Sequence, residues 1–168
     1  MEDNRRVNSA SAPALSGRVA SLHLPPPEPG APLRSVESVE VVQAKGILNE
    51  PRYFARISRT TGQPSRRQIT LIGREQIAEH AAALCIATIP AGAVRANIET
   101  VGIDLVACVG QVLQIGDAAL LVFEPRMPCE KMDAICAGLR ERMKNNRQGV
   151  LAEVLRSGMI RVGDAVII

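Results

Sequence analysis

The sequence predicts a single, mostly β domain, a barrel or rolled sheet with two or more short helices. Many short runs of β-branched and aliphatic residues are separated by Gly, Pro and Asn, which is typical of strands joined by tight turns. Only two stretches space their apolar residues as a helix does. The 168 residues are enough for one domain to build its own core, and with one Tyr, two Phe and no Trp that core is aliphatic.

The first half of the chain is predicted to contain four strands. RVASLHL (18–24) alternates as a short strand does, and PPPEPGAP (25–32) follows as a connector. Proline neither donates a hydrogen bond to a sheet nor continues a helix, so the connector is expected to cross the surface. Aliphatic and β-branched residues recur between turn signals in three further predicted strands, at 36–43, 52–58 and 68–73.

The second half is predicted to contain both helices. In REQIAEHAAAL (74–84), Ile77, Ala81 and Leu84 fall on one helical face. PCEKMDAICAGLRERM (128–143) has the same three-or-four spacing of apolar residues, which predicts a second helix over the whole stretch. Strands are predicted around these helices, at 93–100, 110–116, 118–124, 151–157 and 164–168.

The N-terminal end differs in composition from the rest. Residues 1–16 are rich in Ser, Ala, Asn and Pro, which predicts a disordered tail followed by a domain at 17–168. The longest apolar passage, AAALCIATIPAGAV, is broken by Pro90 and Gly92 and falls short of the roughly 18 residues of a membrane span. We therefore expect no membrane partner.

Charge and aromatic content narrow the class of ligand. The net charge is +3 and the basic residues are spread along the chain, while aromatic residues make up 2% of it. Base stacking and a general nucleic-acid surface are therefore poorly supported, and no nucleic-acid partner is expected. A small anionic cofactor needs far fewer charges.

The four cysteines do not form a zinc pattern. The chain has no CxxC motif and no Cys/His pair at metal spacing, and His23 and His80 stand alone. Reduced thiols in the cytoplasm are the simpler interpretation. Three of the thiols lie among apolar or small residues and are expected to be buried and inert, namely Cys85, Cys108 and Cys136.

Cys129 has different neighbours. It follows Pro128 in PRMPCEKM (125–132), between Arg126 and Lys131. A proline suits the first turn of a helix, where free N–H groups and nearby cations favour a thiolate. Such a thiolate serves as nucleophile, metal ligand or sulfur carrier. The alternative is a small buried hydrophobe, because Cys129 also extends the apolar stripe of the predicted helix.

A second group of polar residues lies in VRANIETVGIDL (94–105). Arg95 and Asn97 are two apart and would share one face of a strand, with Thr100 further along and Asp104 after a turn at Gly102. These side chains would suit an oxyanion or a polar heterocycle; the alternative is a solvated face or a pinned loop. Further candidates for anion contacts are Arg52, Arg66 and Arg67.

These motifs together resemble a known family. GRVASLHL, SVESVEVVQAKGI, RRQITLIGRE, VRANIETVGIDL, VGQVLQIGDA, FEPRMPCEKM and SGMIRVGDAVII follow one another as in a MOSC domain, the module named after the C-terminal part of molybdenum cofactor sulfurases. The resemblance covers residues 17–168 and implies a β-barrel like that of pyruvate kinase. It matches the functional cysteine of the family to Cys129.

The resemblance also implies a pocket for the molybdenum cofactor (molybdopterin). It matches the family's Arg, Asn and acidic positions to Arg95, Asn97 and Asp104. The family commonly has Gly-Asp-Arg after its first Gly-rich turn, whereas this chain reads GILNEPR (46–52). That loop is therefore altered, and a third interpretation is a member that has lost its ligand and serves a structural role.

Two functions are implied by the resemblance. In the first, a standalone module binds the cofactor through Cys129 or carries sulfur on it, with a cysteine desulfurase or a molybdoenzyme as partner. The family is also associated with pyridoxal phosphate, but the chain has no room for a pyridoxal-phosphate domain. In the second, the molybdenum site reduces N-hydroxylated compounds with separate electron-transfer partners. The sequence leaves open whether the protein is an enzyme.

Overall fold

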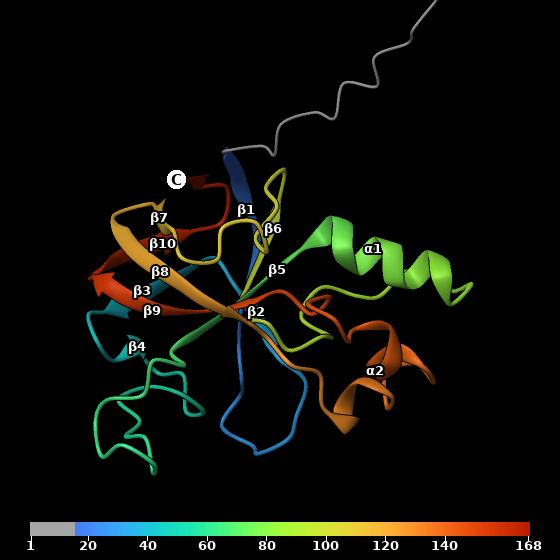
Figure 1. Cartoon of the computed structure of the whole chain (residues 1–168), viewed down its shortest axis with the longest axis horizontal. Coiled ribbons are helices and arrows are strands. Elements are labelled where there is room, and N and C mark those ends of the chain that lie inside the picture. The colour runs from blue at the N-terminus through green and yellow to red at the C-terminus, as the bar shows by residue number, and fades with distance from the viewer. Residues whose placement is uncertain (1–15) are drawn as a thin grey trace, which may run out of the picture.

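Seven strands close into a barrel in the computed structural model, which describes residues 16–168 (Figure 1). The barrel closes where β1 pairs with β11, with Ser16 opposite Ile167 and Gly17 opposite Val166. This confirms the predicted mostly β barrel. In order around the barrel the strands are β11 (Ala165–Ile167), β7 (Val112–Ile115), β8 (Ala118–Pro125), β9 (Val150–Arg156), β5 (Ile69–Gly73), β6 (Ile98–Val101) and β1 (Ser16–Leu24).

Four further strands lie outside the closed ring. β2 (Arg34–Val36) pairs with the end of β1, and a separate three-stranded sheet contains β10, β3 and β4. Its strands are β3 (Ser38–Val42), β4 (Gly46–Ile47) and β10 (Gly158–Arg161). The predicted strand at 36–43 is therefore interrupted at Glu37, because β2 pairs with β1 whereas β3 pairs with β10.

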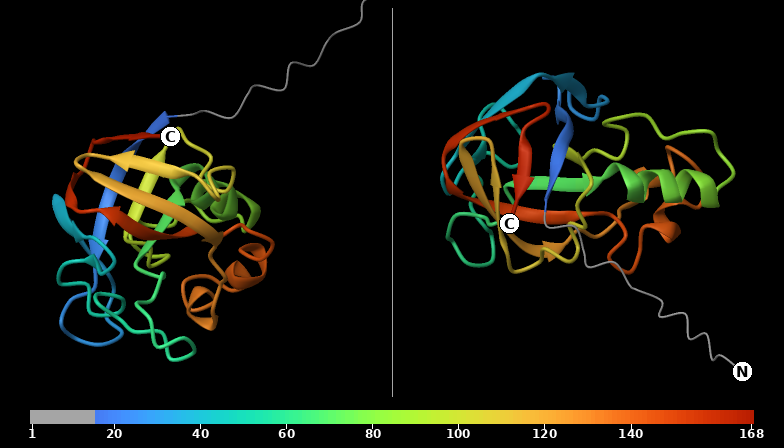
Figure 2. Two further views of the ribbon diagram at one scale, coloured as in Figure 1. Left: turned by 60° about the vertical axis from the view of Figure 1, so that its left-hand side comes forward. Right: turned by 90° about the horizontal axis from the view of Figure 1, so that it is seen from above.

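Helix α1 (Arg74–Ala83) follows β5 directly and projects from one side of the barrel, as the view from above in Figure 2 shows. The chain then returns to β6, which pairs with β5 in parallel. A parallel pair requires a crossover connection, and α1 provides it. The predicted helix at 74–84 is confirmed, with Ile77 and Ala81 buried as its apolar spacing indicated.

The single helix predicted over 128–143 is wrong. The stretch contains a three-residue 3-10 helix, η1 (Glu130–Met132), and one short turn of α-helix, α2 (Leu139–Arg142). Gly138 separates them with a φ of 86°, in the left-handed region that favours glycine. The apolar residues Met132, Leu139 and Met143 are nevertheless buried. Their spacing therefore indicates which residues are buried and does not indicate a continuous helix.

Two predicted strands are also corrected. Residues 52–58 form turns with only an isolated bridge between Ile57 and Pro64, because their backbone bonds go to nearby residues of the same loop. In the stretch 93–100 only the end belongs to β6, and Arg95 sits in a turn with a φ of 62°. Of residues 52–58 only Tyr53 is buried, and Ile57 is 54% exposed. In the second segment Val94, Ala96 and Asn97 are buried although they lie outside the strand.

Two hydrophobic clusters form the core. The larger fills the barrel and includes Leu22, Leu71 and Leu120. The second lies against the wall made by β5, where Ile72 packs with Met132 and with other residues of the helical region. The predicted tail at 1–16 falls outside the described residues except for Ser16, which begins β1. No helix among the described residues is long and apolar enough to cross a membrane.

Candidate functional site

A buried carboxylate, Glu50, organises the loop after β4. The side chain is fully buried and forms an ion pair with Arg52, whose terminal nitrogen lies 2.7 Å from Oε2. Arg52 also donates its backbone N–H to Oε1 at 2.8 Å, and Asn97 donates from Nδ2 to Oε2 at 2.6 Å. Because buried charges are stable only when paired and hydrogen-bonded, Glu50 fixes both partners in place.

Asn97 ties this loop to the barrel. Its Oδ1 accepts hydrogen bonds from the backbone N–H and the hydroxyl of Thr70 on β5, at 3.1 and 3.0 Å. Arg95 and Asn97 do not share a strand face as predicted, since both precede β6. Arg95 instead points its guanidinium to the carbonyl of Ala31, at 3.1 Å.

Arg126 lies at the end of β8 and is 5% exposed. It donates to the carbonyl of Val94 at 3.1 Å and to that of Arg95 at 3.5 Å. Arg52 donates to the same Arg95 carbonyl at 3.3 Å. The two guanidiniums therefore converge on one oxygen, which the left-handed turn at Arg95 presents to them.

Tyr53 joins a third arginine to this pair. The guanidinium carbons of Arg52 and Arg67 lie 4.8 and 5.2 Å from the centre of the Tyr53 ring. Arg67 also donates to the Tyr53 hydroxyl at 3.4 Å. We call Arg52, Arg67 and Arg126 the guanidinium cluster. Among the described residues, Glu50 is the one carboxylate that forms an ion pair with it.

The positive charge of the cluster affects the pKa of Arg126. Its pKa falls to about 10, chiefly because the side chain is buried; the charges of Arg67 and Arg52 lower it as well, while Tyr53 and Cys129 favour the charged form. Arg126 remains cationic at neutral pH. Its Nε is buried without a hydrogen-bond partner, so the site retains an unused donor and excess positive charge.

Cys129 lies beside this cluster, three residues after Arg126, and is half-buried. The expectation that it occupies the first turn of a long helix is wrong. Cys129 precedes the three-residue η1 in an extended conformation, with φ −117° and ψ 173°. A helix this short provides little dipole. Cys129 is close enough to Arg126 to favour the charged form of that guanidinium, whose pKa is about 10.

The comparisons with known proteins are consistent with this fold. The family model described as the MOSC domain matches residues 55–167, more than half of the chain. The chain belongs to the MOSC domain family. This family is associated with molybdenum cofactor binding. No curated protein sequence matches the chain.

Solved structures similar to this MOSC domain share its fold at low identity. The YuaD protein from Bacillus subtilis is 17% identical with a TM-score of 0.75, and the match covers 90% of this chain and 94% of that one. YiiM from Geobacillus stearothermophilus is 19% identical with a TM-score of 0.69, covering 90% and 74% of the two chains. YiiM from Escherichia coli is 20% identical with a TM-score of 0.59, covering 89% and 68%.

The structure places four of the predicted cofactor residues in or next to the guanidinium cluster, and Cys129 is close enough to influence Arg126 of that cluster. Arg52 and Arg67 belong to the guanidinium cluster, while Arg95 and Asn97 bond to its members or to Glu50. A cavity of about 270 Å³ opens beside Tyr53 and Arg67. Arg66, also considered from the sequence, instead forms an exposed ion pair with Glu153 at 3.0 Å.

The other two predicted residues are placed differently. Thr100 is buried on β6, where it pairs with Gly73 and Val19. Asp104 lies after the strand, and its Oδ1 accepts from the backbone N–H of Val106 at 3.0 Å. Neither is bonded to the guanidinium cluster.

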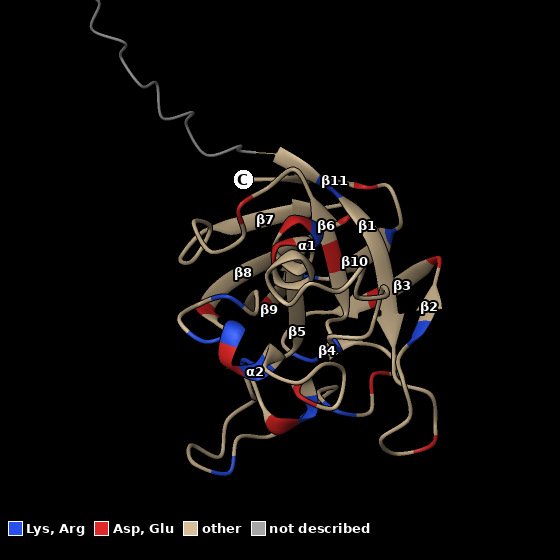
Figure 3. Cartoon of the chain, turned by 90° about the vertical axis from the view of Figure 1, so that its right-hand side faces the viewer, with Lys and Arg blue, Asp and Glu red and all other residues tan. Residues whose placement is uncertain are grey.

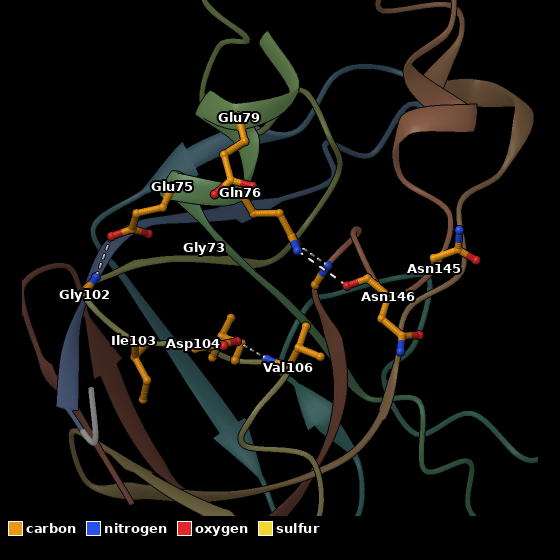
Figure 4. Close-up of a pocket in the computed structure, with 12 residues that line it drawn as sticks. Gly73, Glu75, Gln76, Glu79, Gly102, Ile103, Asp104, Val106, Asn145 and Asn146 are labelled. Carbon is orange, nitrogen blue, oxygen red and sulfur yellow. Dashed lines mark hydrogen bonds between the residues drawn. The ribbon is translucent and has the colours of Figure 1, made fainter. Parts of the chain in front are cut away.

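Asp104 lines the largest described cavity, of about 660 Å³ (Figure 4). The charged residues in its lining are all acidic, Glu75 and Glu79 of α1 together with Asp104, and the acidic positions of α1 appear red in Figure 3. An anionic cofactor is poorly matched to such a lining. The guanidinium cluster therefore suits an anionic cofactor better than this larger cavity does.

The cysteine predictions need one correction. Cys108 is buried, as expected, and its thiol lies 3.1 Å from the carbonyl of Asp104. Burial raises the pKa of this thiol. Cys85, however, is exposed, and Cys136 is only half-buried. Apolar neighbours in the sequence did not predict burial at these two cysteines, because both lie in turns after their helical segments.

Sequence reasoning missed three residues of the site, Glu50, Tyr53 and the buried form of Arg126. The sequence indicates Arg126 only as a neighbour of Cys129, and it predicts an altered loop followed by a strand at EPRY (50–53). A signal was present in the acid-x-Arg order of Glu50 and Arg52, which allows an ion pair two residues apart. Its burial depends on Asn97, which is distant in sequence.

Proposed function

We propose that the guanidinium cluster and Cys129 bind the molybdenum cofactor, with the cluster holding its anionic groups and Cys129 serving as a thiolate ligand. The observation that carries the proposal is Arg126, a buried cation whose Nε has no partner. Guanidiniums bind phosphate and carboxylate groups through paired hydrogen bonds, and Arg is preferred for that role where the site is buried.

The residues fit this cofactor in charge and in donor type. Three guanidiniums face a single paired carboxylate, which leaves positive charge for an anionic ligand. A cysteine thiolate is a soft donor suited to a soft metal centre. When bound, the cofactor supplies oxygen-atom and electron-transfer chemistry, whereas the chain supplies position and charge. Glu50 and Asn97 hold Arg52 and the Arg95 turn in position.

The altered loop at 46–52 also supports the proposal. The family's Gly-Asp-Arg is absent, but Glu50 and Arg52 place a carboxylate and a guanidinium side by side in the same loop. The loop thus retains an acidic residue that orients an arginine. Glu50 has a longer side chain than the family's Asp, and Pro51 separates it from Arg52. The loop therefore supports a member of the family that keeps its ligand.

Metal content tests the proposal directly. The protein is purified from a host that makes molybdenum cofactor, and molybdenum per chain is measured by elemental analysis. We expect molybdenum in the wild type and a loss of most of it in Arg67→Met and Cys129→Ser. Arg67 is exposed, so this variant should keep the fold, which thermal unfolding verifies. Arg161→Met removes an exposed arginine on β10 and serves as the matched control.

Wild-type protein without molybdenum from that host, or equal content in all variants, would overturn cofactor binding. Arg126→Met extends the series to the buried cation. Its expected loss of molybdenum is interpreted only alongside Arg67→Met, because Arg126 also holds the carbonyls of Val94 and Arg95.

Sulfur transfer is the second function that Cys129 supports, since the thiol is half-buried and beside a cation. Incubation with a cysteine desulfurase and cysteine would move one sulfur atom to the Cys129 thiolate and release the desulfurase thiolate. Mass spectrometry should then find the added sulfur on Cys129. Cys85 is the control for nonspecific persulfidation, because it is exposed and lies outside the cluster.

Reduction of N-hydroxylated compounds, with separate electron-transfer partners, is the alternative activity of the same site. A cavity of about 560 Å³ bordered by Arg95 favours it, because a reductase needs space for a small molecule beside the metal site. The molybdenum-loaded protein is assayed with a chemical electron donor and an N-hydroxylated test compound. Turnover that is lost in Cys129→Ser is the expected result.

A further inference from the structure

The cavity of about 560 Å³ lies between three segments distant in sequence: the proline-rich connector, the turn before β6 and the turn after η1. Its lining is almost entirely apolar, with Leu33, Ala93 and Ile135 among the contributors. Such a lining is typical of pockets that bury the body of a small organic molecule.

The charged residues in the lining are Arg95 and Lys131, and no acidic residue belongs to it. Among the described residues, neither forms an ion pair, and the guanidinium of Arg95 has one hydrogen bond, to the carbonyl of Ala31. An apolar pocket with two cations at its border complements a molecule that has an apolar body and an acidic group. The acidic cavity that contains Asp104 has the opposite character.

The cavity is connected to the candidate site through its own residues. The backbone carbonyl of Arg95 accepts hydrogen bonds from Arg52 and Arg126, while its side chain borders the cavity. Lys131 is two residues from Cys129 in the same tight turn. A molecule in the cavity would therefore lie next to the residues that we assign to the cofactor.

We propose that this cavity is the substrate site, and that its substrate is a small molecule with an apolar body and a carboxylate or similar acidic group. Naming the occupant a substrate rests on the proposed function, whereas the binding of such a molecule does not. The apolar wall buries the body of the molecule, and Arg95 and Lys131 hold its acid. A neutral molecule of the same shape binds more weakly because both cations then lose their partner.

Binding of 8-anilinonaphthalene-1-sulfonate, an apolar anionic fluorophore, tests the proposal on the purified full-length protein. The wild type should bind it, and decanoate should displace it at lower concentration than decanamide does. Lys131→Met should weaken binding about twofold to fivefold, as expected for one exposed ion pair, and Lys131→Glu should weaken it further. Ala134→Phe, which adds a ring to the exposed edge of the lining, should block it. Lys45→Met is the matched control, because Lys45 is exposed in the turn between β3 and β4.

Absence of binding in the wild type, equal displacement by decanoate and decanamide, or unchanged affinity in both Lys131→Glu and Ala134→Phe would overturn the proposal. Cys129→Ser and Arg67→Met are measured in the same assay and should bind the fluorophore as the wild type does. We expect these two variants to lose molybdenum and to keep fluorophore binding. Wild-type protein that binds the fluorophore but carries no molybdenum would overturn the proposed function alone.

Discussion

At the scale of single residues, Glu50 matters most to the site because it is a buried charge that depends on its partners. Its two oxygens accept from Arg52 and Asn97, so the carboxylate holds a loop and the segment before β6 together. An amide in the same place would offer one acceptor oxygen, and its NH₂ group would face the N–H donors of Arg52 or Asn97 without an acceptor. The Arg52 guanidinium would also lose its counter-charge.

Glu50→Gln should therefore lower the free energy of unfolding by about 1–3 kcal/mol, the range for buried groups left without partners. Urea unfolding followed by circular dichroism measures the change. Glu40→Gln is the matched control, since Glu40 is exposed on β3, and it should unfold as the wild type does. Equal unfolding of the two variants would mean that the Glu50 ion pair contributes nothing to stability.

At the scale of elements, α1 is anchored by a buried histidine in its last turn. The His80 Nε2 and the Arg147 carbonyl are 2.7 Å apart, which joins α1 to the segment before β9. Burial lowers the pKa of His80 below its usual value of about 6.5, and burial lowers that of His23 on β1 as well. Both rings are therefore neutral in the folded protein at neutral pH.

Stability should consequently fall as the pH drops below about 6.5. Above that pH the histidines are neutral in both states; below it the unfolded chain binds protons that the folded chain resists. The urea midpoint measured from about pH 7.5 to about pH 5 should decrease in the wild type and decrease less in His80→Gln, whose amide still reaches the carbonyl. An identical pH dependence in the variant would contradict the role of His80.

At the scale of the whole molecule, the barrel depends on the pairing of its two ends. β11 lies between β1 and β7, and without it both strands would have an open edge. Val166 is fully buried at this seam, opposite Gly17 and Ile115, whereas the adjacent Ile167 is 48% exposed. Successive residues of a strand face opposite sides, which makes the two a natural pair for comparison.

Val166→Asp should destabilise the barrel by about 3–5 kcal/mol, because it places an unpaired charge in the core. Ile167→Asp, on the outer face, should change stability little. Thermal and urea unfolding of both variants measures the difference. Similar stability of the two would show that the seam does not belong to the cooperative unit.

Much of the fold could be predicted because the buried faces of strands and helices require apolar residues at characteristic spacings in the sequence. The strands predicted from alternation in 18–24 and from aliphatic and β-branched residues in 68–73, and the helix predicted in 74–84, appear close to their predicted positions. The stretch 128–143 failed because helical spacing of apolar residues also arises in turns that pack against one surface. There Gly138 breaks the helix with a positive φ.

For the candidate site, the sequence by itself predicted the kind of chemistry: Cys129 near cations, and arginines with Asn97 suited to an anion. The tertiary structure decided which of these residues meet. Arg52, Arg67 and Arg126 come from three distant segments, and Glu50 is buried only because Asn97 reaches it from the turn before β6. Burial, shared acceptors and the excess of positive charge arise from contacts between segments, and no local pattern of residues encodes them.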